Sequence, residues 1–168
     1  VPSIFNFYKS IEEYFKFPLQ ANIYLTPANS QGFAAHYDNH DVFIIQTHGT
    51  KRWNIYDSPV LFPTQPFDKT KWTKKEPEIT VELKQGDTLY LPRGFIHEAS
   101  TSDAASLHIT LGLLTYTWID ALRMLIEESH LISDFRKSFN WNELPDTEMS
   151  ATIKKLLNEL SDNISPVK

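Results

Sequence analysis

The stretch Gly86-Asp-Thr-Leu-Tyr-Leu-Pro-Arg-Gly-Phe-Ile-His97 ends in a histidine that completes a set begun by His36 and Asp38. Two residues apart on an extended strand, His36 and Asp38 would project from one face, and His97 would reach the same point from another strand. Two histidines and one carboxylate form the facial triad that holds Fe(II) and leaves positions open for a cosubstrate and dioxygen. The set therefore favours an oxygenase, with the three ligands as its catalytic centre.

Short runs of alternating character surround this set, and turn residues such as His48-Gly49 and Gln85-Gly86-Asp87 separate them. This pattern is typical of an antiparallel barrel or sandwich. We predict strands at residues 21–26, 32–37, 42–47, 51–56, 79–83, 88–91, 96–100 and 106–114. Short strands in this number predict a mainly β fold, a double-stranded β-helix or jelly roll of the cupin type.

Apolar residues with helical spacing flank the strands on both sides. Residues 4–17 predict a leading helix that Pro18 ends, and residues 118–126 and 149–164 predict two amphipathic helices. We therefore expect a leading helix within 1–20, a barrel at 21–116 and a helical segment at 117–168. The apolar residues of the last segment would either form a homodimer face or close one end of the barrel, and the sequence favours neither role.

The composition restricts the chemistry open to the chain. It contains no cysteine, which excludes disulfides, thiolate metal sites and a cysteine nucleophile, and fits a cytoplasmic protein. No apolar run approaches the roughly 20 residues that span a bilayer, so we expect no membrane segment. The net charge of -5 argues against direct binding to nucleic acid. The first residue is Val rather than Met, which suggests a piece of a longer protein.

Lys51 shares a strand face with Trp53 and Ile55. A lysine that points into an interior costs free energy unless an anion pairs with it, and a dicarboxylate cosubstrate would supply that anion. The alternative is a solvated lysine at the end of the strand, beside the Gly49 turn. Two other strands each have one polar face, which we expect to line the barrel: Asn22, Tyr24 and Thr26 on the first, Ser106, His108 and Thr110 on the second.

The remaining histidines and one long insertion have less definite roles. His40 would lie at the rim of the site, and His108 would be a core residue or a support for the site. Residues 59–78, rich in Pro, Lys and Thr, fall between the two halves of the metal set and would form a rim or lid.

Several motifs occur in order with family spacing: Asn22-Ile-Tyr-Leu-Thr-Pro, Ala35-His36-Tyr-Asp38, Gly49-Thr-Lys51-Arg-Trp53 and Leu91-Pro-Arg-Gly-Phe-Ile-His97. The sequence resembles the JmjC-type ribosomal oxygenases, also called the cupin-4 family, over about residues 22–114. This resemblance implies that His36, Asp38 and His97 bind Fe(II), and that Lys51 pairs with the distal carboxylate of 2-oxoglutarate. It also implies that Asn22, Tyr24 and Thr110 line the cosubstrate pocket.

By the same resemblance, the chain would be a 2-oxoglutarate-dependent dioxygenase that hydroxylates a side chain of a protein or peptide. Ribosomal proteins are the family's characteristic substrates, with histidine or arginine as target residues, and asparagine is a third candidate. Two other functions remain open from the residues alone. One is a metal-dependent cupin of another reaction class, such as a zinc isomerase or hydrolase, and the other is a non-catalytic metal-binding scaffold. An inward-facing Lys51 would favour the oxygenase over both.

Overall fold

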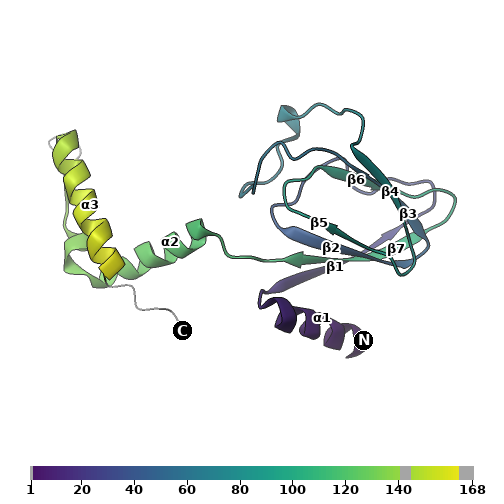
Figure 1. Ribbon diagram of the computed structural model, residues 1–168, viewed down its shortest axis with the longest axis horizontal. Coiled ribbons are helices and arrows are strands. Elements are labelled where there is room, and N and C mark those ends of the chain that lie inside the picture. Colours follow the sequence, from purple (N-terminus) through teal and green to yellow (C-terminus); the bar gives the residue numbers. More distant parts are fainter. Residues whose placement is uncertain (1, 141–144, 163–168) are drawn as a thin grey trace. The chain divides into compact units, whose positions relative to one another are not determined.

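The structure is a computed structural model that describes residues 2–140 and 145–162 (Figure 1). In this part of the chain, seven strands form two antiparallel sheets, one of four strands in the order β1-β7-β2-β5 and one of three in the order β4-β3-β6. The strands are β1 (Leu19–Thr26), β2 (Asp41–His48), β3 (Thr50–Ile55), β4 (Ile79–Lys84), β5 (Thr88–Leu91), β6 (His97–Ser100) and β7 (Ser106–Leu113). The prediction of a mainly β jelly roll is confirmed.

The two sheets pack face to face, as the period-two pattern of their strands requires. Val42 and Ile44 of the larger sheet and Trp53 and Ile55 of the smaller sheet are each at most 5% exposed and belong to one apolar cluster. Leu83, Leu91 and Ala99 complete that cluster. Every second residue of β2 and β3 is buried, so these two strands fix which side chains face the interior.

One predicted strand is absent from the described residues. Residues 32–37 form no strand, and the backbone of the surrounding described segment pairs with β6 at two isolated bridges, Gln31 to Ser100 and His36 to His97. The segment has to cross from β1 to β2 along the rim, and no backbone hydrogen bond is seen from the described residues 33–35, between the two bridges, to a strand. His36 and Asp38 therefore do not lie on one extended strand, and another feature has to position Asp38.

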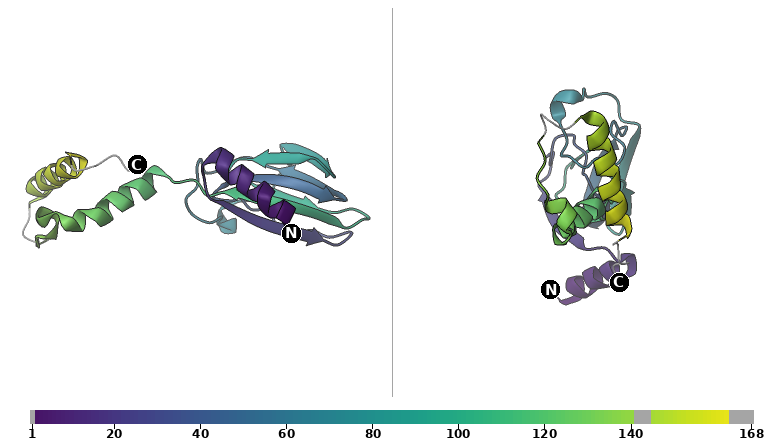
Figure 2. Two further views of the ribbon diagram at one scale, coloured as in Figure 1. Left: turned by 90° about the horizontal axis from the view of Figure 1, so that it is seen from below. Right: turned by 90° about the vertical axis from the view of Figure 1, so that its left-hand side faces the viewer.

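The leading helix, α1 (Pro2–Phe15), confirms the predicted helix and packs on the outer face of the larger sheet (Figure 2). The hydroxyl of Tyr8 donates a hydrogen bond to the carbonyl oxygen of Leu19 at 2.7 Å. The ring of Phe15 lies 5.5 Å from that of Phe43 on β2. These contacts fix the entry of the chain into β1, which lines one wall of the site.

The chain divides into two compact units, residues 1–115 and 116–168. The second contains α2 (Trp118–Glu128), two short 3-10 turns at Ser129–Leu131 and Ser133–Arg136, and α3 (Asp146–Asp162). Thr117 and Asp120 form a reciprocal capping box at the start of α2. Both predicted helices of this segment are confirmed, although positions 163 and 164 lie outside the described residues. None of the described helices has the length and apolarity needed to cross a membrane.

Candidate metal centre and adjoining cavity

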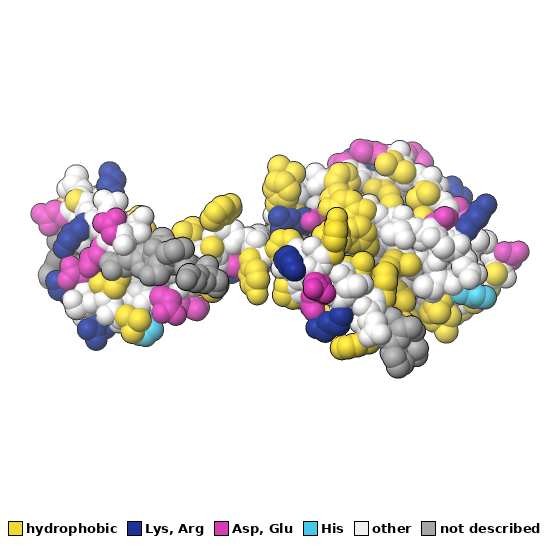
Figure 3. All heavy atoms as spheres, turned by 60° about the horizontal axis from the view of Figure 1, so that its bottom comes forward, with side chains coloured by type: hydrophobic (Ala, Val, Ile, Leu, Met, Phe, Trp, Pro, Cys, Tyr) yellow, Lys and Arg dark blue, Asp and Glu magenta, His cyan; other side chains and the backbone are white. Residues whose placement is uncertain are grey.

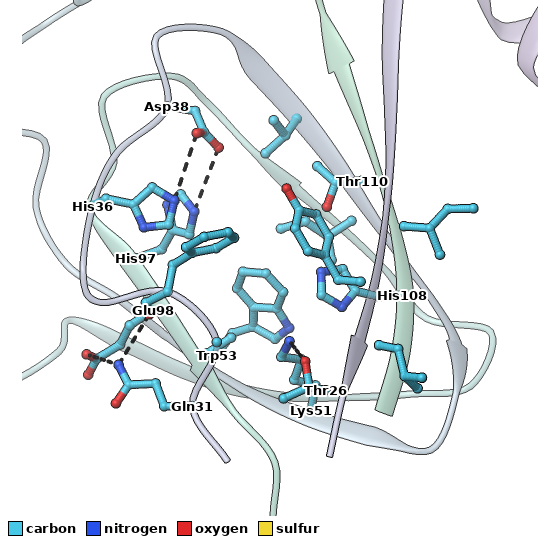
Figure 4. A pocket seen from close by; sticks show the side chains of 18 of the residues that line it. Thr26, Gln31, His36, Asp38, Lys51, Trp53, His97, Glu98, His108 and Thr110 are labelled. Atoms are coloured by element: carbon cyan, nitrogen blue, oxygen red, sulfur yellow. Dashed lines mark hydrogen bonds and ion pairs between the residues drawn. The ribbon is translucent and has the colours of Figure 1, made fainter. Parts of the chain in front are cut away.

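His36, Asp38 and His97 meet at the rim between the two sheets (Figure 4). One ligand atom from each lies within 4.8 Å of the other two. The Nε2 atoms of His36 and His97 lie 3.9 and 3.8 Å from the two carboxylate oxygens of Asp38. Two imidazoles and a carboxylate at these separations can hold one divalent ion of the Fe(II) or Mn(II) kind on one face.

The backbone fixes the proton positions on both rings. Nδ1 of His36 lies 2.8 Å from the carbonyl oxygen of Ala34, and Nδ1 of His97 lies 3.0 Å from that of Phe95. A carbonyl oxygen only accepts hydrogen bonds, so each Nδ1 carries the proton and each Nε2 presents a lone pair toward Asp38. Burial lowers the pKa of His97, which also keeps this ring neutral. Both imidazoles are thus in the tautomer that a metal needs.

The two histidines are held together by their own backbones. The amide of His36 donates to the carbonyl of His97 at 3.1 Å, and the amide of His97 donates back at 2.8 Å. This single bridge brings the two rings to a centroid distance of 4.6 Å. Two reciprocal backbone hydrogen bonds therefore position His36 beside His97, where we had predicted a full strand.

The Leu-Pro-Arg-Gly turn positions Asp38. The amide of Gly94 donates to the carbonyl of Asp38 at 3.0 Å, and the amide of Arg93 donates to Oδ1 of Asp41 at 2.8 Å. Gly94 has a φ of +90°, and a Cβ atom there would approach the carbonyl oxygen of Val60 to 2.7 Å. Only glycine suits this position, because the turn has to lie against residues 58–60 while it fixes Asp38.

A cavity of about 400 Å³ extends from the metal ligands into the barrel. Trp53 forms a wall of this cavity, with its ring 5.9 Å from that of His97 and 5.5 Å from that of His108. The volume is within the range of pockets that enclose small molecules. The barrel therefore offers space for a cosubstrate beside the ligand set.

Lys51 lies inside this cavity and is 3% exposed, so the alternative of a solvated strand end is wrong. Its ammonium donates a hydrogen bond to Oγ1 of Thr26 at 2.8 Å and lies 5.9 Å from the centre of the Trp53 ring. Among the described residues, no carboxylate forms an ion pair with it. Burial lowers the pKa of Lys51 to about 8. The site thus holds a buried cation that lacks an anion.

His108 is a second polar group with unused hydrogen-bonding capacity in the same cavity. It is 3% exposed and stacks on Tyr24 at a centroid distance of 5.0 Å. Its Nδ1 atom is buried without a hydrogen-bond partner among the described residues. Burial, and to a lesser extent the charge of Lys51, lowers the pKa of His108 to about 4, so the ring is neutral. A neutral imidazole can donate one hydrogen bond to a ligand.

The structure brings most of the predicted pocket residues together. Tyr24 on β1 and Thr110 on β7 line the cavity, as does Thr26. Asn22 pairs in register with Thr110 but does not line this cavity. His40 stays outside it and packs against Gly112, where an added Cβ would approach its ring to 2.5 Å.

Sequence reasoning missed three residues of the site. Phe33 is 63% exposed at the cavity and lies 5.7 Å from the ring of His36. Gln31 and Glu98 also line the cavity, and they contact each other through a hydrogen bond of 3.1 Å. The position of Glu98 directly after His97 was the only available signal, and alternation along the strand would have placed its side chain away from the metal.

Comparisons with known proteins agree with this geometry. A family model described as the JmjC domain matches residues 2–121. The chain is 44% identical over 126 residues to the bifunctional lysine-specific demethylase and histidyl-hydroxylase NO66 of Dictyostelium discoideum, covering 71% of this chain and 24% of that protein. It is 38% identical over 138 residues to ribosomal oxygenase 1 of Rattus norvegicus, covering 74% of this chain and 22% of that protein. The chain spans about a quarter of the length of these relatives.

Solved structures of the Escherichia coli ribosomal oxygenase YcfD have the same fold. One superposes with a TM-score of 0.66 at 20% identity and covers 92% of this chain and 44% of that chain. Another, in complex with cobalt and 2-oxoglutarate, superposes with a TM-score of 0.62 at 21% identity and covers 92% and 43% of the two chains. The family match extends over the whole barrel, and it confirms the resemblance drawn from the motifs: this chain belongs to the JmjC domain family.

Proposed function

We propose that this chain is the oxygenase core of an Fe(II)- and 2-oxoglutarate-dependent dioxygenase that hydroxylates a side chain of a ribosomal protein. The observation that carries the proposal is the pairing of a two-histidine, one-carboxylate set with a buried, anion-free Lys51 in one cavity. A zinc hydrolase or isomerase would use the same three ligands but has no need of a buried cation. The names of the relatives, ribosomal oxygenase and histidyl-hydroxylase, support the substrate class.

The donor set fits Fe(II), because His36, Asp38 and His97 offer two neutral imidazoles and one carboxylate on a single face. When bound, the metal together with 2-oxoglutarate would activate dioxygen for insertion into a substrate C–H bond, with succinate and carbon dioxide as coproducts. The protein holds the three ligand atoms in place before the metal arrives, since backbone carbonyls orient both rings. This preorganisation favours binding of the metal.

The cavity fits a dicarboxylate that reaches from the metal ligands to Lys51. The Lys51 ammonium has hydrogen-bonding capacity beyond its bond to Thr26, and Nδ1 of the neutral His108 has no partner. A carboxylate between them would receive charge-assisted hydrogen bonds from Lys51 and one hydrogen bond from His108. Tyr24 and Thr110 would flank the ligand, while the wall formed by Trp53 would exclude water from it. Asn22 would act only through its pairing with Thr110.

A second groove, of about 650 Å³, meets the metal ligands from outside the barrel. Residues 33–39 form one side of it and residues 66–70 form the other. It shares Phe33, His36 and Asp38 with the cosubstrate cavity, so a chain lying in it would pass directly over the ligand set. This arrangement supports a polypeptide substrate, whose side chain would enter beside Phe33.

We also propose that the C-terminal unit forms a homodimer. Within this unit, Trp118, Ile119, Leu122 and Ile126 are 87%, 47%, 55% and 60% exposed and lie on one face of α2. Figure 3 shows apolar side chains at the surface of this unit. A second copy of the same helix would cover such a face.

We place the protein in the cytoplasm, where ribosomal proteins are synthesised, and fractionation of cells would check this location.

Mass spectrometry of ribosomal proteins tests the proposed activity. Purified chain would be incubated in air with Fe(II), 2-oxoglutarate and ribosomal proteins from cells that lack the enzyme. We expect one or a few side chains to gain the mass of a single oxygen atom, and no gain with the His97→Ala variant. Unmodified ribosomal proteins, together with oxidation of a free metabolite by the parent chain, would contradict the substrate class.

A further inference from the structure

Glu98 follows the metal ligand His97 on β6, and its carboxylate is the meeting point of several segments. The residue is 8% exposed. Oε1 accepts hydrogen bonds from the Tyr56 hydroxyl and the Lys74 ammonium, each at 2.7 Å, and Oε2 accepts from Lys74 at 2.9 Å and from Gln31 at 3.1 Å. The amide of Asn54 lies 3.5 Å from Oε1. The donors offset the free-energy cost of burying the carboxylate, and each of them is held to Glu98 in turn.

The donors come from separate parts of the chain. Tyr56 follows β3, and Gln31 belongs to the segment that also carries His36 and Asp38. Lys74 lies in residues 59–78, the long irregular stretch that we call the strap. Through Glu98, the strap and the segment with two metal ligands are both attached to the strand that carries the third ligand (Figure 4 shows the Gln31 contact).

The strap depends on side chains for its attachment to the barrel. Phe67 packs on Tyr37, between two metal ligands, at a centroid distance of 5.0 Å, and Trp72 packs on Tyr56 at 5.2 Å. The backbone of the strap has few bonds to the sheets, one of which joins the amide of Glu78 to the carbonyl of Ile55 at 2.9 Å. Lys74 itself is 61% exposed at its side chain, so its bond to the buried carboxylate can open toward water.

We propose that Glu98 is a positioning residue that latches the strap through Lys74 and thereby fixes the outer wall of the substrate groove. This inference rests on the proposed function for its consequence, because residues 66–70 of the strap form one side of the groove that would hold the polypeptide. Glu98 borders the cosubstrate cavity, but Lys74 lies outside it, so losing Lys74 leaves the cavity lining in place. Opening it moves Phe67 and the groove wall while the ligand set and Lys51 keep their places.

Cleavage by chymotrypsin measures the latch without any substrate. Phe67 and Trp72 are partly buried against the barrel, whereas Leu61 in the same strap is 76% exposed and serves as an internal reference, since chymotrypsin also cleaves after leucine. In Lys74→Met we expect cleavage after Phe67 and Trp72 to accelerate about fivefold, with cleavage after Leu61 unchanged, because the protease acts on the open population. Lys71→Met is the matched control: it removes the same charge, but Lys71 pairs at 3.3 Å with Asp68 inside the strap.

A double-mutant cycle tests whether the faster cleavage in Lys74→Met comes from the loss of its bond to Glu98. Glu98→Gln and Lys74→Met should each speed cleavage after Phe67, and the double variant should be no faster than the faster single variant, because both remove one interaction. Unchanged cleavage in Lys74→Met, equal acceleration in Lys71→Met, or effects that add fully in the double variant would each overturn the latch.

Kinetics separate the latch from a general loss of structure. With extracted ribosomal proteins as the probe, Lys74→Met should raise the concentration needed for half-maximal hydroxylation about fivefold, while the maximal rate and the KM for 2-oxoglutarate stay at parent values. A fall in the maximal rate, or a change in the KM for 2-oxoglutarate, would contradict a role confined to the groove wall. If the parent chain hydroxylates nothing, the proposed function fails, but the proteolysis experiment still decides whether the latch exists.

Discussion

Lys51 is the residue in which stability and function conflict most directly. It is 3% exposed, and no carboxylate among the described residues pairs with it. A buried charge without a partner destabilises a fold, and an apolar side chain of similar length removes that cost. We expect Lys51→Met to raise the free energy of unfolding by about 1 kcal/mol or more, measured by urea unfolding without cosubstrate.

The same variant should lose cosubstrate. A charge-assisted hydrogen bond contributes about 1.5 to 3 kcal/mol, which corresponds to about 10- to 100-fold in affinity for 2-oxoglutarate. Calorimetric titration with Mn(II) present would measure this loss, and the affinity for Mn(II) itself should stay at the parent value. A variant that is less stable than the parent, or that binds 2-oxoglutarate equally well, would show that Lys51 has another role.

Lys51 also predicts how cosubstrate binding depends on pH. Burial lowers its pKa to about 8 from 10.5, so the ammonium loses its proton as the pH rises through 8. We expect the affinity for 2-oxoglutarate to be constant near pH 7 and to fall above pH 8, by about tenfold per unit. Between pH 8 and 10.5 the unfolded chain binds more protons than the folded chain, so the free energy of unfolding should rise in that window. Lys51→Met should show neither dependence, and a flat affinity profile in the parent would contradict the assignment.

At the scale of elements, the turn at Gly94 connects the fold to the metal site. A Cβ atom at this position would approach Val60 and Ser58 to 2.7 and 2.8 Å, and the φ of +90° adds backbone strain. We expect Gly94→Ala to cost about 2 kcal/mol or more and to weaken Mn(II) binding, since the amide of Gly94 holds the carbonyl of Asp38.

Gly86→Ala is the matched control for this change. Gly86 also has a positive φ, +98°, but a Cβ atom there would meet nothing within 4 Å. It should therefore destabilise the chain through strain alone and leave the affinity for Mn(II) intact. Equal metal affinities in the two variants would show that the turn does not position Asp38.

The alternating sequence pattern predicted most of the strands, and there is a physical reason why the strand it predicted at 32–37 does not form. Alternation indicates which residues prefer an extended backbone, but pairing depends on what lies alongside. Residues 31 and 36 each meet β6 at one bridge, and the rest of the segment has no partner strand. The grouping of His36, Asp38 and His97 was still predictable, because a candidate triad needs only the residue types and a fold that brings them together.

The site was predictable where a residue lies on a regular strand. Lys51 follows from the alternation of β3, and Tyr24 and Thr110 follow from the paired polar faces of β1 and β7. The contact between Glu98 and Lys74 was not predictable, because Lys74 lies in an irregular stretch 24 positions before Glu98, and no periodic pattern indicates where such a stretch lies. Asn22 shares the polar face of β1 but does not line the cavity. Alternation indicates which face a side chain is on, but not how far along the strand the cavity extends.

At the scale of the whole molecule, the C-terminal unit gives a test of assembly. Leu122 is 55% exposed in the middle of the apolar face of α2. We expect the parent chain to sediment as a dimer at micromolar concentration and Leu122→Asp to sediment as a monomer, because a charge at the centre of an apolar interface is costly. Monomeric parent chain, or a dimer that survives this substitution, would contradict the proposed interface.

Turnover of 2-oxoglutarate tests the central claim most directly. Parent chain in air with Fe(II), 2-oxoglutarate and extracted ribosomal proteins should form succinate, with dioxygen consumed in equal amount. His97→Ala should form none, and Lys51→Met should form succinate only at much higher 2-oxoglutarate concentration. A folded parent chain that binds metal at His36, Asp38 and His97 but forms no succinate above the His97→Ala background would show that this site is not an oxygenase.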